Sequence, residues 1–172
     1  MLKFSTEEFV DVLNDNNEVF RSVPRSQSYA QKLPHQIVHV LVFDGTKLLV
    51  VRRSLSVRYL PGFYCTSAGG HVSSGESVES AAEREMFEEI GLKGPINFVE
   101  TFDFHHDFRV RVSLYIKYLD LSVEALTLNP LEAAEGFFLS EKEFEDLDIL
   151  HCHPQLHLCA RKAFDHIKER SK

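Results

Sequence analysis

The segment that most constrains this chain is a glutamate-rich stretch bounded by glycines, GGHVSSGESVESAAEREMFEEIGLKG at residues 69–94. Ser77 stands where a helix N-cap is expected, acidic residues fill the early turns, and Gly91 follows the last apolar position as a stop signal. The pattern predicts one helix over residues 78–90. Apolar residues recur every four positions on the side that can pack against a sheet: Ala82, Met86 and Ile90.

Three carboxylates share another face of this helix, because Glu85 and Glu89 are one turn apart and Glu88 lies three residues from Glu85. Such a cluster repels itself unless a positive charge lies beside it. Hard cations such as Mg²⁺ take oxygen ligands and often share a few carboxylates with substrate phosphates. Arg84 could hold one carboxylate in place or reach a phosphate. The alternative is an exposed acidic helix with solvated glutamates, but the loop GHVSSGE can also bring main-chain carbonyls close to a bound ion.

The spacing of these residues resembles the Nudix box, the signature of Nudix hydrolases. Gly70, Glu76 and the run REMFEEIGL at residues 84–92 match its polar and glycine positions, with Met86 in an aliphatic position. In that family the residue at the position of Glu76 more often supports the junction of loop and helix than it binds metal. The resemblance implies the Nudix fold, an α/β (α+β) domain with a mixed sheet sandwiched between helices, and it extends loosely over residues 34–145.

The resemblance also implies a function and a set of site residues. We expect a hydrolase that cleaves a pyrophosphate linkage in a nucleoside-diphosphate-linked or related diphosphate substrate, with Mg²⁺ or Mn²⁺ as its cofactor. The expected catalytic residues are Glu85, Glu89 and Arg84, of which Arg84 orients Glu85. The metal ligands implied by the box are Glu85, Glu88 and Glu89, together with the carbonyl of Gly69.

Two further groups are needed for hydrolysis at phosphorus. A carboxylate must accept the proton of the attacking water. We expect Glu85 in this role, or an acid outside the box such as Glu132 or Glu135, because the family often places an extra acidic residue near there; as loop acids they would have no role. Arginine side chains suit a diphosphate through their bidentate geometry. The candidates, which could also be ordinary surface arginines, are Arg52, Arg53 and Arg58.

The segment before the box gives an alternative function. HQIVHVLVFDGTKLLVVRRSLSVRYLPGFYCTSAGGH resembles the Nudix subgroup that contains type I isopentenyl diphosphate isomerase, which isomerises an allylic diphosphate by proton transfer. Gly69 replaces the cysteine of that enzyme, and Arg109 and Arg111 stand where its strand carries acids. His35 and His71 match two of its metal-binding histidines, and we expect them to be structural or substrate-facing. A third alternative is a catalytically silent module that binds nucleotide or protein.

The rest of the chain predicts strands on both sides of the glutamate helix. Residues 1–33 form an N-terminal extension, with a β-hairpin around residues 15–17 and a short helix over residues 5–13 as the alternative; the Nudix hydrolase domain covers residues 34–172. QIVHVLVF and KLLVVRR flank a turn and predict a core hairpin. FYCTSAG, PINFVETFDF, FRVRVSLYIKYL and FFL are strand-like, whereas EKEFEDL and PQLHLCARKAFDHIKER have helical spacing.

Composition limits the partners. The chain has 172 residues and a net charge of −7, which argues against binding a nucleic-acid polymer or an anionic membrane and favours a small-molecule diphosphate substrate. No apolar run approaches the roughly 20 residues that span a bilayer, and the N-terminus MLKFSTEEF shows no apolar signal region. Three cysteines without framework spacing fit a reduced, cytoplasmic protein. A homodimer remains open, because the N-terminal hairpin could pack on a partner.

Two weaker patterns have ordinary explanations. HCHPQLH superficially resembles a transition-metal cluster, but Pro154 separates its histidines, and we expect them to be satisfied surface residues near the last helix. They are His151, His153 and His157. Cys65 could be taken for a nucleophile, but a buried strand cysteine is the commoner role.

Overall fold

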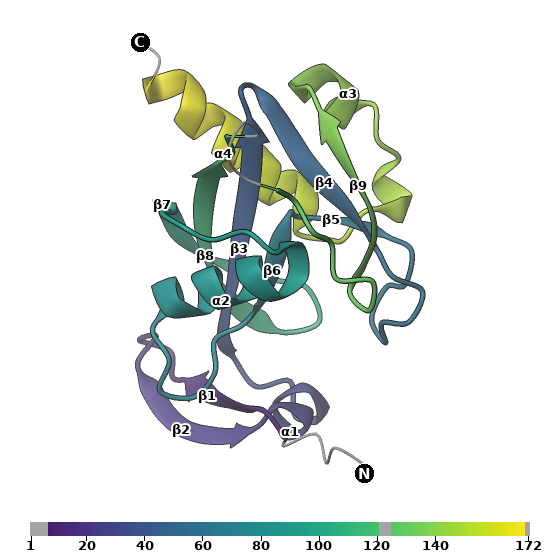
Figure 1. The fold of residues 1–172 in the computed structure, drawn as a ribbon. Helices are drawn as coiled ribbons and strands as arrows, with labels where there is room; N and C mark the ends of the chain where they lie inside the picture. Colours follow the sequence, from purple (N-terminus) through teal and green to yellow (C-terminus); the bar gives the residue numbers. More distant parts are fainter. Residues whose placement is uncertain (1–6, 121–124, 171–172) are drawn as a thin grey trace.

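The centre of the molecule is a mixed sheet built around one long strand. The structure, a computed structural model, describes residues 7–120 and 125–170, so the MLKFST portion of the N-terminus lies outside the described residues. Strand β3 (His35–Asp44) runs parallel to β8 (Arg109–Tyr118) along one edge (Figure 1). Its other edge pairs antiparallel with β6 (Ala68–His71) and, at the far end, with β4 (Lys47–Arg53).

The remaining strands extend the sheet on each side. Antiparallel pairing joins β7 (Asn97–His105) to β8, and β4 pairs with both β5 (Tyr64–Cys65) and β9 (Ala133–Leu139). The N-terminal strands β1 (Phe9–Leu13) and β2 (Val19–Pro24) form an antiparallel hairpin that joins the same sheet through one register pair with β3. The hairpin therefore lies at one end of the sheet (Figure 1).

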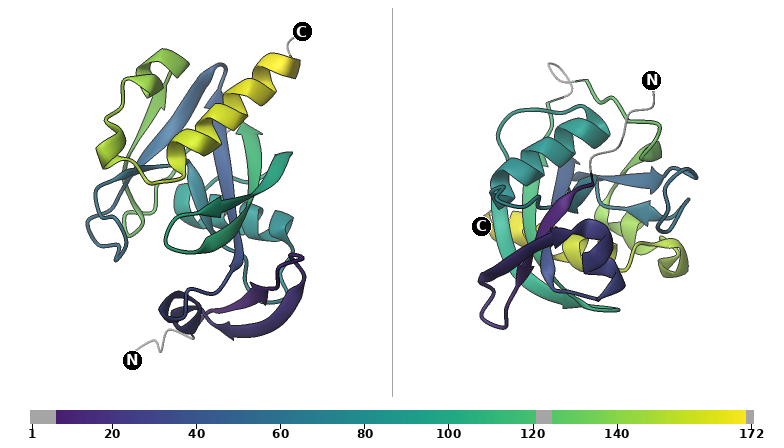
Figure 2. Two further views of the ribbon diagram at one scale, coloured as in Figure 1. Left: turned by 180° about the vertical axis from the view of Figure 1, so that it is seen from behind. Right: turned by 90° about the horizontal axis from the view of Figure 1, so that it is seen from below.

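Helices cover both faces of the sheet, which confirms the expected α+β sandwich. On β3, Val40 and Val42 pack with helix α2 (Val78–Ile90), whereas Leu41 and Phe43 pack with helix α4 (Leu156–Arg170). This alternation follows from the two-residue period of a strand. Figure 2 shows the α4 side in its left view. The short elements are α1 (Arg25–Ala30), α3 (Glu141–Glu145) and the 3₁₀ turn η1 (Ile149–His151).

Helix α2 begins and ends where its sequence signals predict. The Ser77 hydroxyl accepts a hydrogen bond from the Ser80 N–H at 3.1 Å, and Gly91 ends the helix with a left-handed backbone at φ 74°. The apolar side of the helix is fully buried against the sheet: Ala82, Met86 and Ile90. No helix in the described part of the chain is long and apolar enough to cross a membrane.

Two hairpins differ in how far their strands stay together. The predicted β3–β4 hairpin turns at Gly45, but only two register pairs next to the turn are formed before the strands diverge to other partners. The β1–β2 hairpin stays paired and turns through Asn17, whose φ is 63°. The alternative helix over residues 5–13 begins outside the described residues, and Phe9–Leu13 is strand. Helix α1 was not predicted.

Candidate active site

The guanidinium group of Arg84, in the middle of α2, is the centre of a hydrogen-bond network that joins this helix to the loop before it. It donates to both carboxylate oxygens of Glu76 at 2.9 Å and to the main-chain oxygen of His71 at 2.9 Å. Its Nη1 donates to Glu85 at 2.8 Å and to Glu88 at 3.3 Å. The hydrogen bonds from Arg84 hold the pKa of Glu76 below its usual range. Arg84 therefore joins the loop before α2 to two of the glutamates on the helix.

Glu85 reaches the sheet because Gly70 has no side chain. A Cβ atom on Gly70 would overlap the Glu85 carboxylate, so the glycine leaves the space that this carboxylate fills. The Glu85 side chain is only 12% exposed. Burial raises its pKa, although the hydrogen bond and charge of Arg84 act in the opposite direction. The close approach of helix and strand explains why the box has a glycine here.

Glu89 is the more strongly perturbed carboxylate. Burial, followed by the nearby charges of Glu85 and Glu132, raises its pKa to about 8. One of its oxygens accepts a hydrogen bond from the Gly69 N–H at 3.3 Å. Two largely buried carboxylates thus lie beside Gly69 and Gly70 of β6, and burying two like charges this close together is costly unless a cation joins them.

The donor set fits a hard divalent cation. Carboxylate oxygens are the ligands that Mg²⁺ and Mn²⁺ prefer, and Glu85 and Glu89 offer such oxygens beside the Gly69 peptide. Glu88, the third expected ligand, is 55% exposed and contacts Arg84. Within residues 7–120 and 125–170, no group of three or more acidic, histidine or cysteine side chains is arranged so that it could hold a metal ion. The fit therefore rests on the chemistry and charge deficit of the donors.

The candidate arginines separate onto different faces. Arg53 is the last residue of β4, where its charge acts on the pKa of Glu89 and Cys65 and also on that of His153. Its Nε donates to the main-chain oxygen of Tyr59 at 3.0 Å, so it also supports the loop that follows β4. Arg53 is the candidate arginine that the structure brings to the glutamates; Arg58 lies exposed in that loop.

Arg52 and Glu135 are paired with each other. They are register partners on β4 and β9, and an ion pair joins Arg52 Nη2 to Glu135 Oε1 at 3.0 Å. The other register partner of Arg52 is Tyr64, which packs in the core on the α4 side. The structure thus places this pair away from the box glutamates. Glu132, in contrast, lies close enough to Glu89 to raise its pKa.

Two imidazoles from different elements stack beside the box loop. The rings of His35 and His71 have centroids 5.3 Å apart, and the Tyr29 hydroxyl is hydrogen-bonded to His71 Nε2 at 2.8 Å. Burial, and then the neighbouring His35, lower the pKa of His71 to about 3. Burial also lowers the pKa of His35, so both rings are neutral near pH 7. The sequence resemblance paired these histidines, but the contact with Tyr29 on α1 was not predicted.

The other singled-out residues do not form sites. His151 bonds Asp148, His153 lies against the rings of His39 and Tyr59, and His157 packs on Phe144, so the three histidines point to different partners. The expectation of satisfied surface histidines holds for His151 but is wrong for the other two: His153 is largely buried, and His157 has a buried Nε2 without a hydrogen-bond partner among the described residues. Burial raises the pKa of the Cys65 thiol to about 12, which leaves it unreactive at neutral pH.

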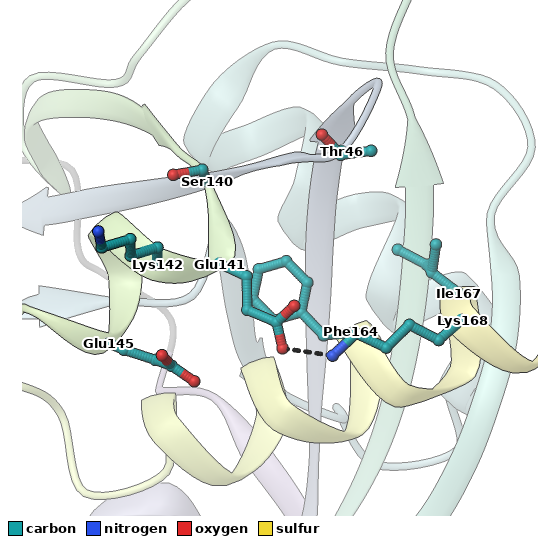
Figure 3. A pocket seen from close by; sticks show the side chains of 8 residues that line it. All are labelled: Thr46, Ser140, Glu141, Lys142, Glu145, Phe164, Ile167 and Lys168. Atoms are coloured by element: carbon teal, nitrogen blue, oxygen red, sulfur yellow. Dashed lines mark hydrogen bonds and ion pairs between the residues drawn. The ribbon is translucent and has the colours of Figure 1, made fainter.

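A separate depression lies on the α4 side of the sheet. It has a volume of about 590 Å³ and is lined by residues of α3, α4 and the β3–β4 turn, with the Lys168–Glu141 ion pair at its rim and Phe164 within (Figure 3). None of the glutamates of α2 lines it. The depression is therefore not part of the site described above.

Comparison with known proteins identifies relatives of this chain. A model of the NUDIX domain matches residues 33–161. The "Uncharacterized Nudix hydrolase YfcD" of Salmonella typhi is 39% identical over 93 residues, which is 54% of this chain and 50% of that protein. The chain thus spans about half the length of this curated relative.

Solved structures share the fold. The crystal structure of DR0079 from Deinococcus radiodurans has a TM-score of 0.70 at 24% identity and covers 80% of this chain and 86% of its own. The NUDIX domain of Shewanella oneidensis NrtR, complexed with ADP ribose, has a TM-score of 0.63 at 14% identity, with 87% and 100% covered. At these identities the likeness shows the arrangement of strands and helices and nothing finer.

Proposed function

Because this chain belongs to the Nudix family, we propose that it is a divalent-metal-dependent hydrolase that cleaves a pyrophosphate linkage in a small-molecule diphosphate. The observation that carries the proposal is the pair of largely buried carboxylates, Glu85 and Glu89, with raised pKa values beside the Gly69–Gly70 backbone. In a metal-dependent hydrolase, a bound divalent cation would supply the positive charge that these two carboxylates lack. An exposed acidic helix, the alternative reading, would leave these side chains in water.

The proposed cofactor is Mg²⁺ or Mn²⁺. Its ligands would be Glu85, Glu88, Glu89 and the carbonyl of Gly69. When bound, such an ion neutralises phosphate charge and lowers the pKa of water. The chain's own contribution is to hold the carboxylates in place, which Arg84 does for Glu85 and the Gly69 N–H does for Glu89.

The remaining roles follow from position. Glu132 lies beside Glu89 at the edge of the site and is exposed, so it can accept a proton from water and release it to solvent. Arg53 would bind the diphosphate through its planar guanidinium group. Arg52 and Glu135 are less suited to these roles because they neutralise each other on the other side of the sheet.

The proposed substrate class is a nucleoside diphosphate linked to a second group, or a related diphosphate. The NrtR domain that shares this fold was solved with ADP ribose, a compound of that class. The described cysteines are all free thiols, which suits a reducing compartment, and we place the protein in the cytoplasm.

The isomerase alternative is opposed by the space at Gly69. That enzyme requires a cysteine at this position, but a Cβ here would lie 2.5 Å from His39 Nδ1 and 2.6 Å from the Val38 oxygen. Neither neighbour can give way easily, because His39 is buried and hydrogen-bonded to Thr66 and Gln155, and the oxygen is main chain. The position therefore excludes a thiol in this backbone arrangement.

The test is hydrolysis of a panel of diphosphate compounds, including ADP-ribose, a dinucleotide, a nucleotide sugar and isopentenyl diphosphate, with Mg²⁺ and then Mn²⁺. Cleavage of a linkage between two groups gives two phosphomonoesters, so products are detected as inorganic phosphate after added alkaline phosphatase, and phosphate released directly is measured in parallel. Glu89→Gln removes the proposed ligand charge, and Glu83→Gln, exposed on the same helix, is the matched control. We expect release from one class that Glu89→Gln abolishes and Glu83→Gln leaves intact. Equal release by both variants would contradict the proposed function.

A further inference from the structure

The N-terminal hairpin contacts the box loop through one carboxylate. Asp11 Oδ1 accepts a hydrogen bond from the Ser74 hydroxyl at 2.7 Å, and Asp11 Oδ2 accepts one from the Gly75 N–H at 3.0 Å. Gly75 has a left-handed φ of 77°, so this N–H belongs to the tightest part of the loop. Both oxygens of a single side chain thus hold two successive residues of the loop, a charge-assisted arrangement stronger than neutral hydrogen bonds.

Main-chain contacts place Asp11 at this position. The Ser74 N–H donates to the Phe9 oxygen at 2.8 Å, and Val10 forms an isolated antiparallel bridge with Ser73. Val10 is fully buried. One edge of β1 pairs with β2, and the opposite edge pairs with the loop at Val10 and with β3 at Val12.

A second contact reaches the other end of the loop. Tyr29, on α1, forms the 2.8 Å hydrogen bond with His71 Nε2, and its ring packs edge-on to the His71 ring with centroids 5.6 Å apart. Phe108 packs edge-on to Tyr29 at 5.4 Å, which limits the movement of that ring. His71 is thereby fixed from the N-terminal side, as Ser74 and Gly75 are.

Both contacts lead to Arg84. The main-chain oxygen of His71 accepts from Arg84 at 2.9 Å. At the other end, the Ser73 N–H donates to Glu76 at 3.1 Å, and Glu76 holds Arg84 with two hydrogen bonds at 2.9 Å. The His71 oxygen and the Glu76 carboxylate therefore orient the Arg84 guanidinium. These two residues are the first and last of the loop segment 71–76, which the N-terminal residues hold.

We propose that residues 7–32, which we call the N-terminal unit, are a positioning element of the active site. Through Asp11 and Tyr29 the unit fixes loop residues 71–76, the loop fixes Arg84, and Arg84 fixes Glu85. This inference rests on the function proposed above, since Glu85 is there a metal ligand. Asp11 and Tyr29 act through other residues and need not touch the substrate.

The experiment compares Asp11→Ala, Asp11→Asn and Tyr29→Phe with Asp15→Ala, which removes an exposed acid from the turn of the same hairpin. Mn²⁺ affinity is measured by electron paramagnetic resonance, together with kcat, KM and Tm. Loss of hydrogen bonds to a charged group predicts a roughly tenfold weaker Mn²⁺ affinity and a roughly tenfold lower kcat for Asp11→Ala. KM changes less than about twofold, since substrate contacts remain. Asp11→Asn, which keeps an acceptor, lies between, and Asp15→Ala matches wild type.

The proposal would be overturned if Asp11→Ala had a lower Tm but the same Mn²⁺ affinity and the same kcat as Asp15→Ala. The contact of Asp11 with the loop would then be only structural. If Asp11→Ala does not fold, Asp11→Asn and Tyr29→Phe carry the same comparison. If wild type neither binds Mn²⁺ nor hydrolyses any compound, the proposed function fails. Hydrogen exchange of the backbone amides then tests the positioning role separately. Faster exchange through residues 72–85 in Asp11→Ala supports the positioning role of Asp11, and a change confined to the hairpin refutes it.

Discussion

The two faces of the sheet are covered by helices of similar length but opposite character. Helix α4 packs an apolar row that includes Leu156, Ala160 and Phe164, and its lysines pair with acids at the surface. Helix α2 also buries an apolar row, but beside it lie Glu85 and Glu89 with raised pKa values. The α4 face has the character of a stabilising core, whereas the α2 face keeps buried charges, which is typical of a functional site.

The largest effect is expected from removing apolar volume on the α4 face. Phe164 is buried and packs edge-on against Phe43, so Phe164→Ala should lower the free energy of unfolding by about 3–5 kcal/mol. Turnover per folded molecule should not change. Urea unfolding and the specific activity of the folded fraction check both statements; a loss of activity without a loss of stability would remove the distinction between the faces.

The next largest effect is expected on the α2 face, where filling the space at Gly70 should lower turnover. Gly70→Ala puts a methyl group where the Glu85 carboxylate lies, so metal-dependent turnover should fall about a hundredfold, or about 2.7 kcal/mol of transition-state stabilisation. Gly45→Ala is the control: its Cβ would meet open space, but its φ of 57° should cost about 1 kcal/mol of stability. If the two variants have equal turnover, the space at Gly70 is not functional.

A smaller effect separates two neighbouring arginines. Arg53→Ala should raise KM roughly tenfold, because it removes the proposed contact with the diphosphate. Arg52→Ala, which breaks only the ion pair with Glu135, should leave KM unchanged. Steady-state kinetics on the substrate found in the panel make the comparison, and a larger effect at Arg52 would reverse the assignment of these two residues.

The last expected effect is absent at neutral pH and appears only in acid: a pH dependence of stability from the neutral histidine just before α4. Burial lowers the pKa of His153 to about 3, below the usual 6.5, so the unfolded chain binds a proton that the folded chain rejects. Its contribution to stability is present above pH 6.5 and is lost as the pH falls from 6.5 toward 3. His153→Asn should flatten the pH dependence of Tm over this window; an unchanged slope would show that the ring is not buried in its neutral form.

Much of this fold follows from local sequence signals. Ser77 and Gly91 fix the ends of α2, and the strand-like segments on both sides of this helix predict a sheet sandwiched between helices. The family likewise follows from the spacing of the box. The direction of Arg52 was harder to predict, because the strand carries a register shift between Arg52 and Arg53. A simple two-residue alternation is unsafe at such a position.

The contacts of the N-terminal unit could not be predicted from local signals. A turn around Asp15 indicates a hairpin, but no pattern says that Asp11 will meet Gly75 across 64 residues. That contact depends on the pairing of β1 with β3, which consists of a single register pair. Long-range register of this kind is decided by packing, which the sequence does not display.

The central claim is that the carboxylates on α2 hold a divalent cation. Calorimetric titration of Mn²⁺ into wild type and Glu89→Gln tests it most directly, with Glu83→Gln as the control on the same helix. The account predicts saturable binding to wild type and Glu83→Gln, and binding at least about tenfold weaker to Glu89→Gln. Equal affinity in all three proteins would contradict it, because the ion would then bind elsewhere.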